Sequence, residues 1–109
     1  MSRSRLASCE SDEPAGFLPR TCHVYVVLLH RPDGRIGFYV GQSALTPEER
    51  FAQHKAGVRS SRHVRKYGVH LMPELYARYN PLTREEAATL ERAIAERLRQ
   101  QGCWVEGGH

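Results

Sequence analysis

Glu91 is a charged residue at a position of a predicted helix where apolar residues are expected. Residues 83–101 predict a helix, and apolar side chains at helical spacing define its buried stripe: Ala87, Leu90, Ile94 and Leu98. At about 100° per residue, Glu91 falls inside that stripe. A carboxylate among core positions is costly unless a cation or a metal ion compensates it. Glu91 is therefore either a metal ligand or a stripe-edge residue paired with an arginine such as Arg50 or Arg92.

A second candidate feature is the stretch from residue 50 to residue 66, which contains bases and no acid. Its basic side chains are Arg50, Lys55, Arg59, Arg62, Arg65 and Lys66, with His54 and His63 between them. Such a run is the electrostatic footprint expected for a phosphate backbone, and a solvated basic face is the simpler alternative. Arg50 and His54 are four residues apart, so both lie on one helix face. Arginine can hold a phosphate oxygen, and histidine can transfer a proton near neutral pH.

Two tyrosines complete the set of residues that could do chemistry. If Arg31 faces Arg35 across a turn, Tyr25 and Tyr39 point to the same face of a hairpin as diagonal neighbours. Two phenols beside a basic patch can orient or deprotonate a water molecule, although tyrosines in strands often only pack. Gly41 follows Tyr39 closely and lets the backbone leave the sheet there.

The predicted elements place these residues in one small domain. Strands are expected at 22–29 and 35–40, joined by a turn in which Gly34 takes a positive φ, and a third strand at 74–79. Capping boxes that begin at Thr46 and Thr83 start helices that end at Gly57 and Gly102. A short helix is expected from residue 60 to residue 67. The fold class is therefore α/β (α+β), with a three-stranded antiparallel sheet whose first strand is central and flanked by helices.

Composition limits the function further. The 109 residues suffice for one domain, and the net charge of +4 comes from 16 bases, mostly arginine, against 12 acids. No apolar segment is long enough for a membrane span or a secretory signal. The three cysteines, Cys9, Cys22 and Cys103, are widely spaced and are expected to be free thiols in a reducing cytoplasm. Residues 1–21 resemble a flexible leader, and residues 22–109 form the expected domain.

Taken together, these residues resemble the GIY-YIG endonuclease family. The two motifs appear as His23-Val24-Tyr25 and Tyr39-Val40-Gly41, followed in order by Arg50, His54 and Leu90-Glu91-Arg92-Ala93-Ile94. The resemblance spans about residues 23–105. Two departures are visible: His23 stands where the first motif usually has glycine, and no asparagine follows the last helix. The second departure favours weaker activity, or a need for extra residues or a partner.

The resemblance implies hydrolysis of phosphodiester bonds with one Mg²⁺ or Mn²⁺ ion. Glu91 would hold the metal, which polarises the scissile phosphate and stabilises the leaving 3′ oxygen. Arg50 would stabilise the developing charge, and Tyr25 would be the general base, relayed by Tyr39 or His54. Tyrosine is a poor base unless its pKa is lowered, and Arg50 with the metal would lower it. The remaining bases, which would contact the nucleic-acid backbone, are Lys55, Arg59, Arg62, Arg65 and Lys66.

The expected substrate is nucleic acid, with DNA as the first expectation and little sequence specificity. Targeting would come from the substrate's structure or from a protein partner, and a transient dimer would serve double-strand cutting. Two other functions stay open. One is a non-catalytic nucleic-acid-binding module on the same scaffold. The other is a small interaction domain whose basic face binds an acidic protein. A metal requirement for cleavage separates the first from an enzyme, and insensitivity to DNA competition identifies the second.

Overall fold

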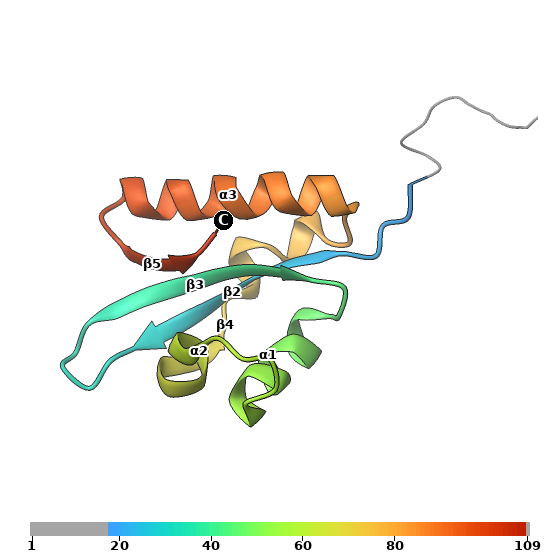
Figure 1. Ribbon diagram of the computed structural model, residues 1–109. Coiled ribbons are helices and arrows are strands. Elements are labelled where there is room, and N and C mark those ends of the chain that lie inside the picture. Colours follow the sequence, from blue (N-terminus) through green and yellow to red (C-terminus); the bar gives the residue numbers. More distant parts are fainter. Residues whose placement is uncertain (1–17, 109) are drawn as a thin grey trace, which may run out of the picture.

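The computed structural model describes residues 18–108, which form a four-stranded mixed sheet between two layers of helices. The strands are β2 (His23–His30), β3 (Ile36–Ser43), β4 (Gly68–Leu71) and β5 (Trp104–Gly107). The helices are α1 (Pro47–Ala56), α2 (Arg62–Tyr67) and α3 (Arg84–Gln100), with 3₁₀ turns η2 (Pro73–Leu75) and η3 (Ala77–Tyr79). Figure 1 shows α3 on one face of the sheet and α1 with α2 on the other.

The β2–β3 hairpin follows the predicted register. The N–H of Arg31 donates to the carbonyl of Arg35, and Gly34 has a φ of 90°. Residue 27 consequently pairs with Tyr39, and Tyr25 pairs with Gly41. The two tyrosines are therefore diagonal neighbours on one face, as the sequence predicted.

The predicted third strand at 74–79 is wrong. Those residues form the two 3₁₀ turns, and the strand beside β2 is β4, which lies earlier in the chain. The prediction rests on the alternation of Leu75, Ala77 and Tyr79 with more polar neighbours, but Ala77 and Tyr79 are exposed and the buried side chain is Tyr76, which points into the core from a turn. Pro73 has no backbone N–H for a sheet ladder, so it ends the extended segment that β4 begins.

The sheet is also neither three-stranded nor wholly antiparallel. Its order is β4-β2-β3-β5, and β5 pairs in parallel with β3 from Gly37 to Val40. β2 does have a neighbour on each side, as predicted for a central strand. β5 has only four residues, and a strand of that length gives almost no periodicity in a sequence.

The helices begin and end where their capping residues predict. The side chains of Thr46 and Thr83 accept the N–H groups of Glu49 and Glu86 in two capping boxes. Gly57 and Gly102 take left-handed φ values of 84° and 86° after α1 and α3. α2 starts two residues later than expected, after the N-cap Ser61.

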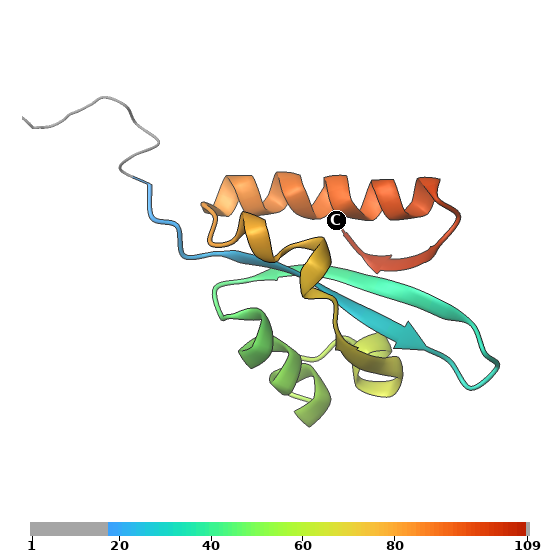
Figure 2. The ribbon, with the colours of Figure 1, turned by 180° about the vertical axis from the view of Figure 1, so that it is seen from behind.

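The core lies on both faces of β2 and β3. Side chains alternate along a strand, so Val24, Val26 and Val40 face α3, while Tyr25 and Val27 face α1 and α2. All five are buried. Figure 2, from behind, shows the 3₁₀ turns linking β4 to α3 along the side of the sheet. Among residues 18–108, no helix is long and apolar enough to cross a membrane.

The expected leader, residues 1–21, falls mostly outside the described residues. Of its last four residues, all exposed, Arg20 forms an ion pair of 3.0 Å with Glu86 at the start of α3. Cys22 then pairs with Leu82 in an isolated bridge. Cys22 and Cys103 are free thiols, as predicted, and Cys9 lies outside the described residues.

Candidate active site

Tyr25, Tyr39 and His54 form a closed group of three rings on the α1 side of the sheet. The Tyr25 hydroxyl lies 2.9 Å from Nε2 of His54. The ring centroids are 6.2 Å apart for the two tyrosines and 5.6 Å apart for Tyr39 and His54. Tyr25 is 1% exposed and His54 is 0% exposed. The hairpin supplies the two phenols, on one face as the register predicted, and α1 supplies the imidazole that lies against them.

The hydrogen bonds of His54 fix which of its ring nitrogens carries the proton. Nδ1 accepts the backbone N–H of Ser61 at 2.8 Å, so it carries no hydrogen when the ring is neutral. The proton is therefore on Nε2, which donates to the Tyr25 oxygen. Burial, with the charge of Arg50, lowers the pKa of His54 to about 4. A neutral donor fixed in this way does not fit the proton relay that the sequence suggested for His54.

Burial dominates the acidity of both phenols. It raises the pKa of Tyr25 well above its ordinary value, with a further rise from Tyr39, and the Arg50 charge offsets only part of this. Burial also raises the pKa of Tyr39, followed by the negative charge of Glu91. The expected lowering by Arg50 is thus present but outweighed, because the hydroxyls lie in a low-dielectric environment.

Arg50 is half-buried beside these rings, and its guanidinium also shapes the loop after α1. Its Nη2 donates to the carbonyl of Arg59 at 2.7 Å, and its Nη1 donates to the side chain of Gln53 at 3.0 Å. Arg59 has a positive φ of 45°, and this hydrogen bond holds the loop in that conformation. Arg50 therefore stands close enough to affect both phenols while anchoring the loop that carries the basic residues.

Glu91 lies in the buried face of α3, as its helical position predicted, and is 7% exposed. Its Oε2 accepts the N–H of Gly108 at 3.2 Å. The ion pairs found within residues 18–108 do not include Glu91, so the alternative of a pair with Arg50 or Arg92 is not observed. Its charge acts on Tyr39 and Tyr25, raising the pKa of both.

Glycines at three positions bring the carboxylate and the phenols together. A Cβ at Gly41 would lie 2.7 Å from the Tyr25 hydroxyl and 3.0 Å from Cε1 of Tyr39. A Cβ at Gly107 would lie 3.2 Å from Cε2 of Tyr39. Gly107 thus packs on the Tyr39 ring while its neighbour Gly108 binds Glu91. The end of β5 and the residue after it therefore contact both the Tyr39 ring and the Glu91 carboxylate.

The donor set fits a metal with few protein ligands. In the described part of the chain, no three His, Cys, Asp or Glu side chains gather to hold an ion among themselves. Glu91 is a single buried carboxylate, and Oε1 makes no hydrogen bond within residues 18–108. Mg²⁺ is commonly bound by one or two carboxylates and keeps several waters that substrate phosphates can replace. Glu91 therefore suits such an ion and does not suit an all-protein cage.

The basic residues from position 55 to position 66, at the end of α1, in the loop that follows and on α2, divide into two groups. Lys55 donates to the carbonyls of Arg65 and Gly68 at 3.2 and 2.9 Å, so its ammonium caps the end of α2. This structural role leaves Lys55 less suited to a phosphate than predicted. The other four are exposed on the loop and on α2: Arg59, Arg62, Arg65 and Lys66.

Sequence reasoning missed two residues that position the site. The side-chain amide of Asn80 donates to the carbonyl of Val24 at 2.8 Å and accepts the Val24 N–H at 2.9 Å. It thus makes the two backbone hydrogen bonds that a neighbouring strand would make at the residue before Tyr25. Gly108 provides the N–H that orients Glu91. An isolated asparagine gives no pattern in a sequence. The Gly-Gly pair at 107–108 is a visible signal, since both take positive φ values.

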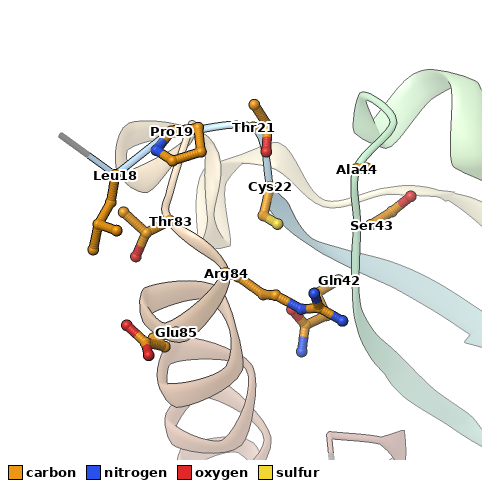
Figure 3. Close-up of a pocket in the computed structure, with 10 residues that line it drawn as sticks. All are labelled: Leu18, Pro19, Thr21, Cys22, Gln42, Ser43, Ala44, Thr83, Arg84 and Glu85. Carbon is orange, nitrogen blue, oxygen red and sulfur yellow. The ribbon is translucent and has the colours of Figure 1, made fainter.

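A pocket at the start of α3 lies away from the tyrosines, none of which lines it. It has a volume of about 660 Å³ and adjoins the site only through Gln42, which follows Gly41. Figure 3 shows Arg84 extending from α3 toward the end of β3, with the thiol of Cys22 beside it. The pocket contains no pair of groups suited to hydrolysis, so the ring cluster with Arg50 and Glu91 is the better candidate site. Comparison with models of known families, with curated proteins and with solved structures finds no match for this chain.

Proposed function

We propose that this protein is a metal-dependent endonuclease of the GIY-YIG type that hydrolyses phosphodiester bonds of nucleic acid, DNA first. One observation carries the proposal. The rings of Tyr25, Tyr39 and His54 are in contact. Arg50 of α1 and Glu91 of α3 are close enough to shift the pKa of both phenols. Proton transfer, anion stabilisation and metal binding need such a set, and simple packing does not.

Glu91 is the residue that would hold Mg²⁺ or Mn²⁺, since its Oε2 is oriented by Gly108 and its carboxylate has no cationic partner among the described ion pairs. When bound, such an ion polarises the phosphate and stabilises the leaving 3′ oxygen. Arg50 contributes positive charge near the phenols and stabilises the charge that develops on the phosphate oxygens.

Tyr25 is the proposed general base. Tyr25 first releases its hydroxyl proton to solvent. The water oxygen then forms a bond to phosphorus while its proton passes to the Tyr25 phenolate, the bond to the 3′ oxygen breaks, and that oxygen takes up a proton from solvent. The products are a 5′-phosphate and a 3′-hydroxyl. His54 supports this role by donating from Nε2 to the Tyr25 oxygen, which favours the ionised form. Burial opposes ionisation, so Tyr25 becomes a base only when positive charge accompanies the substrate into the site.

The exposed bases on α2 and its preceding loop support a phosphate backbone as the partner, without sequence readout. Targeting by the structure of the substrate or by a protein partner, a transient dimer for double-strand cleavage and a cytoplasmic location complete the proposal.

The test is nicking of supercoiled plasmid with Mg²⁺, with Mn²⁺ and with EDTA. We expect nicking with either metal, none with EDTA, and a loss of at least 100-fold in Glu91→Gln. Glu96→Gln is the matched control, since Glu96 is exposed on the same helix and its side chain accepts a hydrogen bond from Gln100 at 3.3 Å.

Nicking that persists in EDTA or in Glu91→Gln would contradict the proposal. A gel shift without nicking under any metal would favour the non-catalytic nucleic-acid-binding module. Absence of both, with binding to an acidic protein that DNA does not displace, would favour the interaction domain.

A further inference from the structure

A second group of side chains meets around Trp104, at the end of the sheet where the hairpin turns. The guanidinium carbons of Arg35 and Arg31 lie 4.9 and 5.6 Å from the centroid of the indole. Arg31 lies equally close to the ring of Tyr67 in α2, at 5.6 Å. We call Trp104, Arg31, Arg35 and Tyr67 the Trp104 cluster. Figure 1 shows β5 beginning near the same end of the sheet as the β2–β3 turn.

The position of the indole is built into the hairpin. A Cβ at Gly37 would lie 2.5 Å from Cε3 of Trp104, so only glycine leaves room for the ring. The indole N–H donates to Glu106 at 2.7 Å, which fixes the ring's orientation. Trp104 as a whole is half-buried.

The two guanidinium groups are poorly neutralised. Asp33 is 3.7 Å from Nε of Arg31 and is itself largely exposed, and this Nε is buried without a hydrogen-bond partner in the described chain. The Arg35 guanidinium makes no ion pair or hydrogen bond within residues 18–108. Two like charges held beside one ring repel each other, and an anion between them removes that cost. Guanidinium groups fit phosphate oxygens, and an indole can stack on a nucleobase.

The Trp104 cluster continues directly from the candidate active site. Gly41, Tyr39 and Gly37 alternate on the same face of β3, and Trp104 pairs with Gly37. Two residues of a strand span about 7 Å, so roughly 13 Å separate Gly41 from Gly37, and Arg35 lies roughly 20 Å away. A duplex advances about 3.4 Å per nucleotide of each strand. The cluster thus lies roughly four to six nucleotides from a phosphate placed beside Tyr25.

We propose that the Trp104 cluster is a second nucleic-acid contact, which rests on the proposed nuclease function and extends it. Arg31 and Arg35 bind backbone phosphates roughly four to six nucleotides from the cleaved bond, and Trp104 packs against a base or sugar there. This contact orients the strand along β3 and sets a minimum length of substrate on one side of the cut.

The first measurement is DNA binding in EDTA, where no cleavage occurs. The chain has one tryptophan, so emission excited at a wavelength where its five tyrosines do not absorb reports on this cluster alone. We expect a labelled 20-base-pair duplex to bind by anisotropy and to change the Trp104 emission at the same concentrations. We expect Arg35→Gln and Arg31→Gln each to weaken binding several-fold. Each should also reduce the slope of the logarithm of the binding constant against the logarithm of the salt concentration by about one.

Arg78→Gln is the matched control. Arg78 is an exposed arginine that lies 4.6 Å over Tyr79 in the same manner, but beside α3. This variant should bind as the wild type does. In cleavage assays, the wild type should lose efficiency when one flank is shorter than about six nucleotides, and Arg35→Gln should lose that dependence.

The outcomes separate the two proposals. If the wild type binds no DNA, the proposed function itself fails. If it binds and nicks, but the Trp104 emission stays constant and Arg35→Gln matches Arg78→Gln, only the contact at the Trp104 cluster fails.

Discussion

The phenolic oxygen of Tyr25 accepts a hydrogen bond from Nε2 of His54 over 2.9 Å, because Ser61 already occupies Nδ1. This relationship joins three segments: the central strand, α1 and the loop before α2. It also fixes the direction of the hydrogen bond. The hydroxyl proton of Tyr25 therefore does not point at His54. His54 thus positions Tyr25 and stabilises its ionised form, without exchanging a proton with it.

Tyr25→Phe tests this assignment. The substitution keeps the buried ring and removes the oxygen that the proposal uses as base. We expect nicking to fall roughly 100- to 10,000-fold, with DNA binding unchanged. We also expect a loss of about 1–3 kcal/mol in the free energy of unfolding, because the Nε2–H of His54 loses its buried acceptor. The control is Tyr79→Phe, which removes an exposed hydroxyl that contacts Arg78. Wild-type nicking by Tyr25→Phe would remove Tyr25 from the mechanism.

His54 should make the protein less stable in mild acid. Its pKa is about 4 in the folded protein and 6.5 in the unfolded chain, so the unfolded chain takes up the proton first. The stability from the neutral ring is complete above pH 6.5 and is lost as the pH falls toward 4, by up to about 3 kcal/mol. Urea unfolding at pH 7 and pH 5 measures this loss. His54→Gln should show a flatter dependence, whereas a variant of the exposed His30 should not differ from the wild type.

Local signals in the sequence predict the parts of the fold that depend on neighbouring residues. The capping boxes at Thr46 and Thr83 and the turn at Gly34 predict α1, α3 and the hairpin. The two edge strands depend on distant partners. β4 and β5 each have four residues, and their pairing with β2 and β3 cannot be seen in so short a pattern. The 3₁₀ turns at 73–79 resemble a strand in sequence because Leu75, Ala77 and Tyr79 alternate with more polar residues, although the buried side chain there is Tyr76.

In the candidate site, too, the sequence predicts features set by neighbouring residues and misses those that depend on distant ones. The helical position of Glu91 predicts its burial, and the hairpin register predicts that the two phenols share a face. The proton position on His54 could not be predicted, because it depends on the N–H of Ser61 in a loop. The bond between Glu91 and Gly108 likewise joins α3 to a segment that begins only after the last strand.

Gly41→Ala should impair cleavage more than it impairs folding. The new Cβ would meet the Tyr25 hydroxyl at 2.7 Å and the Tyr39 ring at 3.0 Å, so both rings must shift. A displacement of about 1 Å in a reacting group can cost roughly 100-fold in rate. Gly34→Ala is the control for stability: Gly34 has a φ of 90° and no atom within 4 Å of its Cβ position. We expect Gly34→Ala to lose about 1 kcal/mol and keep its activity. Equal activities of the two variants would contradict this account of Gly41.

Tyr76→Phe should stabilise the protein. Tyr76 is 2% exposed, and its hydroxyl has no hydrogen-bond partner within residues 18–108. Burial, followed by the charges of Glu48 and Glu74, raises its pKa to about 12, which is consistent with a hydroxyl held away from water. Removing an unsatisfied buried hydroxyl recovers its desolvation cost, about 1 kcal/mol, while the ring keeps its packing.

Thermal unfolding measures this gain, which corresponds to a rise in Tm of roughly 4–8 °C for a domain of this size. Tyr79→Phe is again the control, because that hydroxyl is exposed, and its change should stay within about 0.5 kcal/mol. A lower Tm for Tyr76→Phe would show that the hydroxyl has a partner in solution. Tyr76 lies outside the candidate site, so nicking by Tyr76→Phe should equal that of the wild type at temperatures where both are folded.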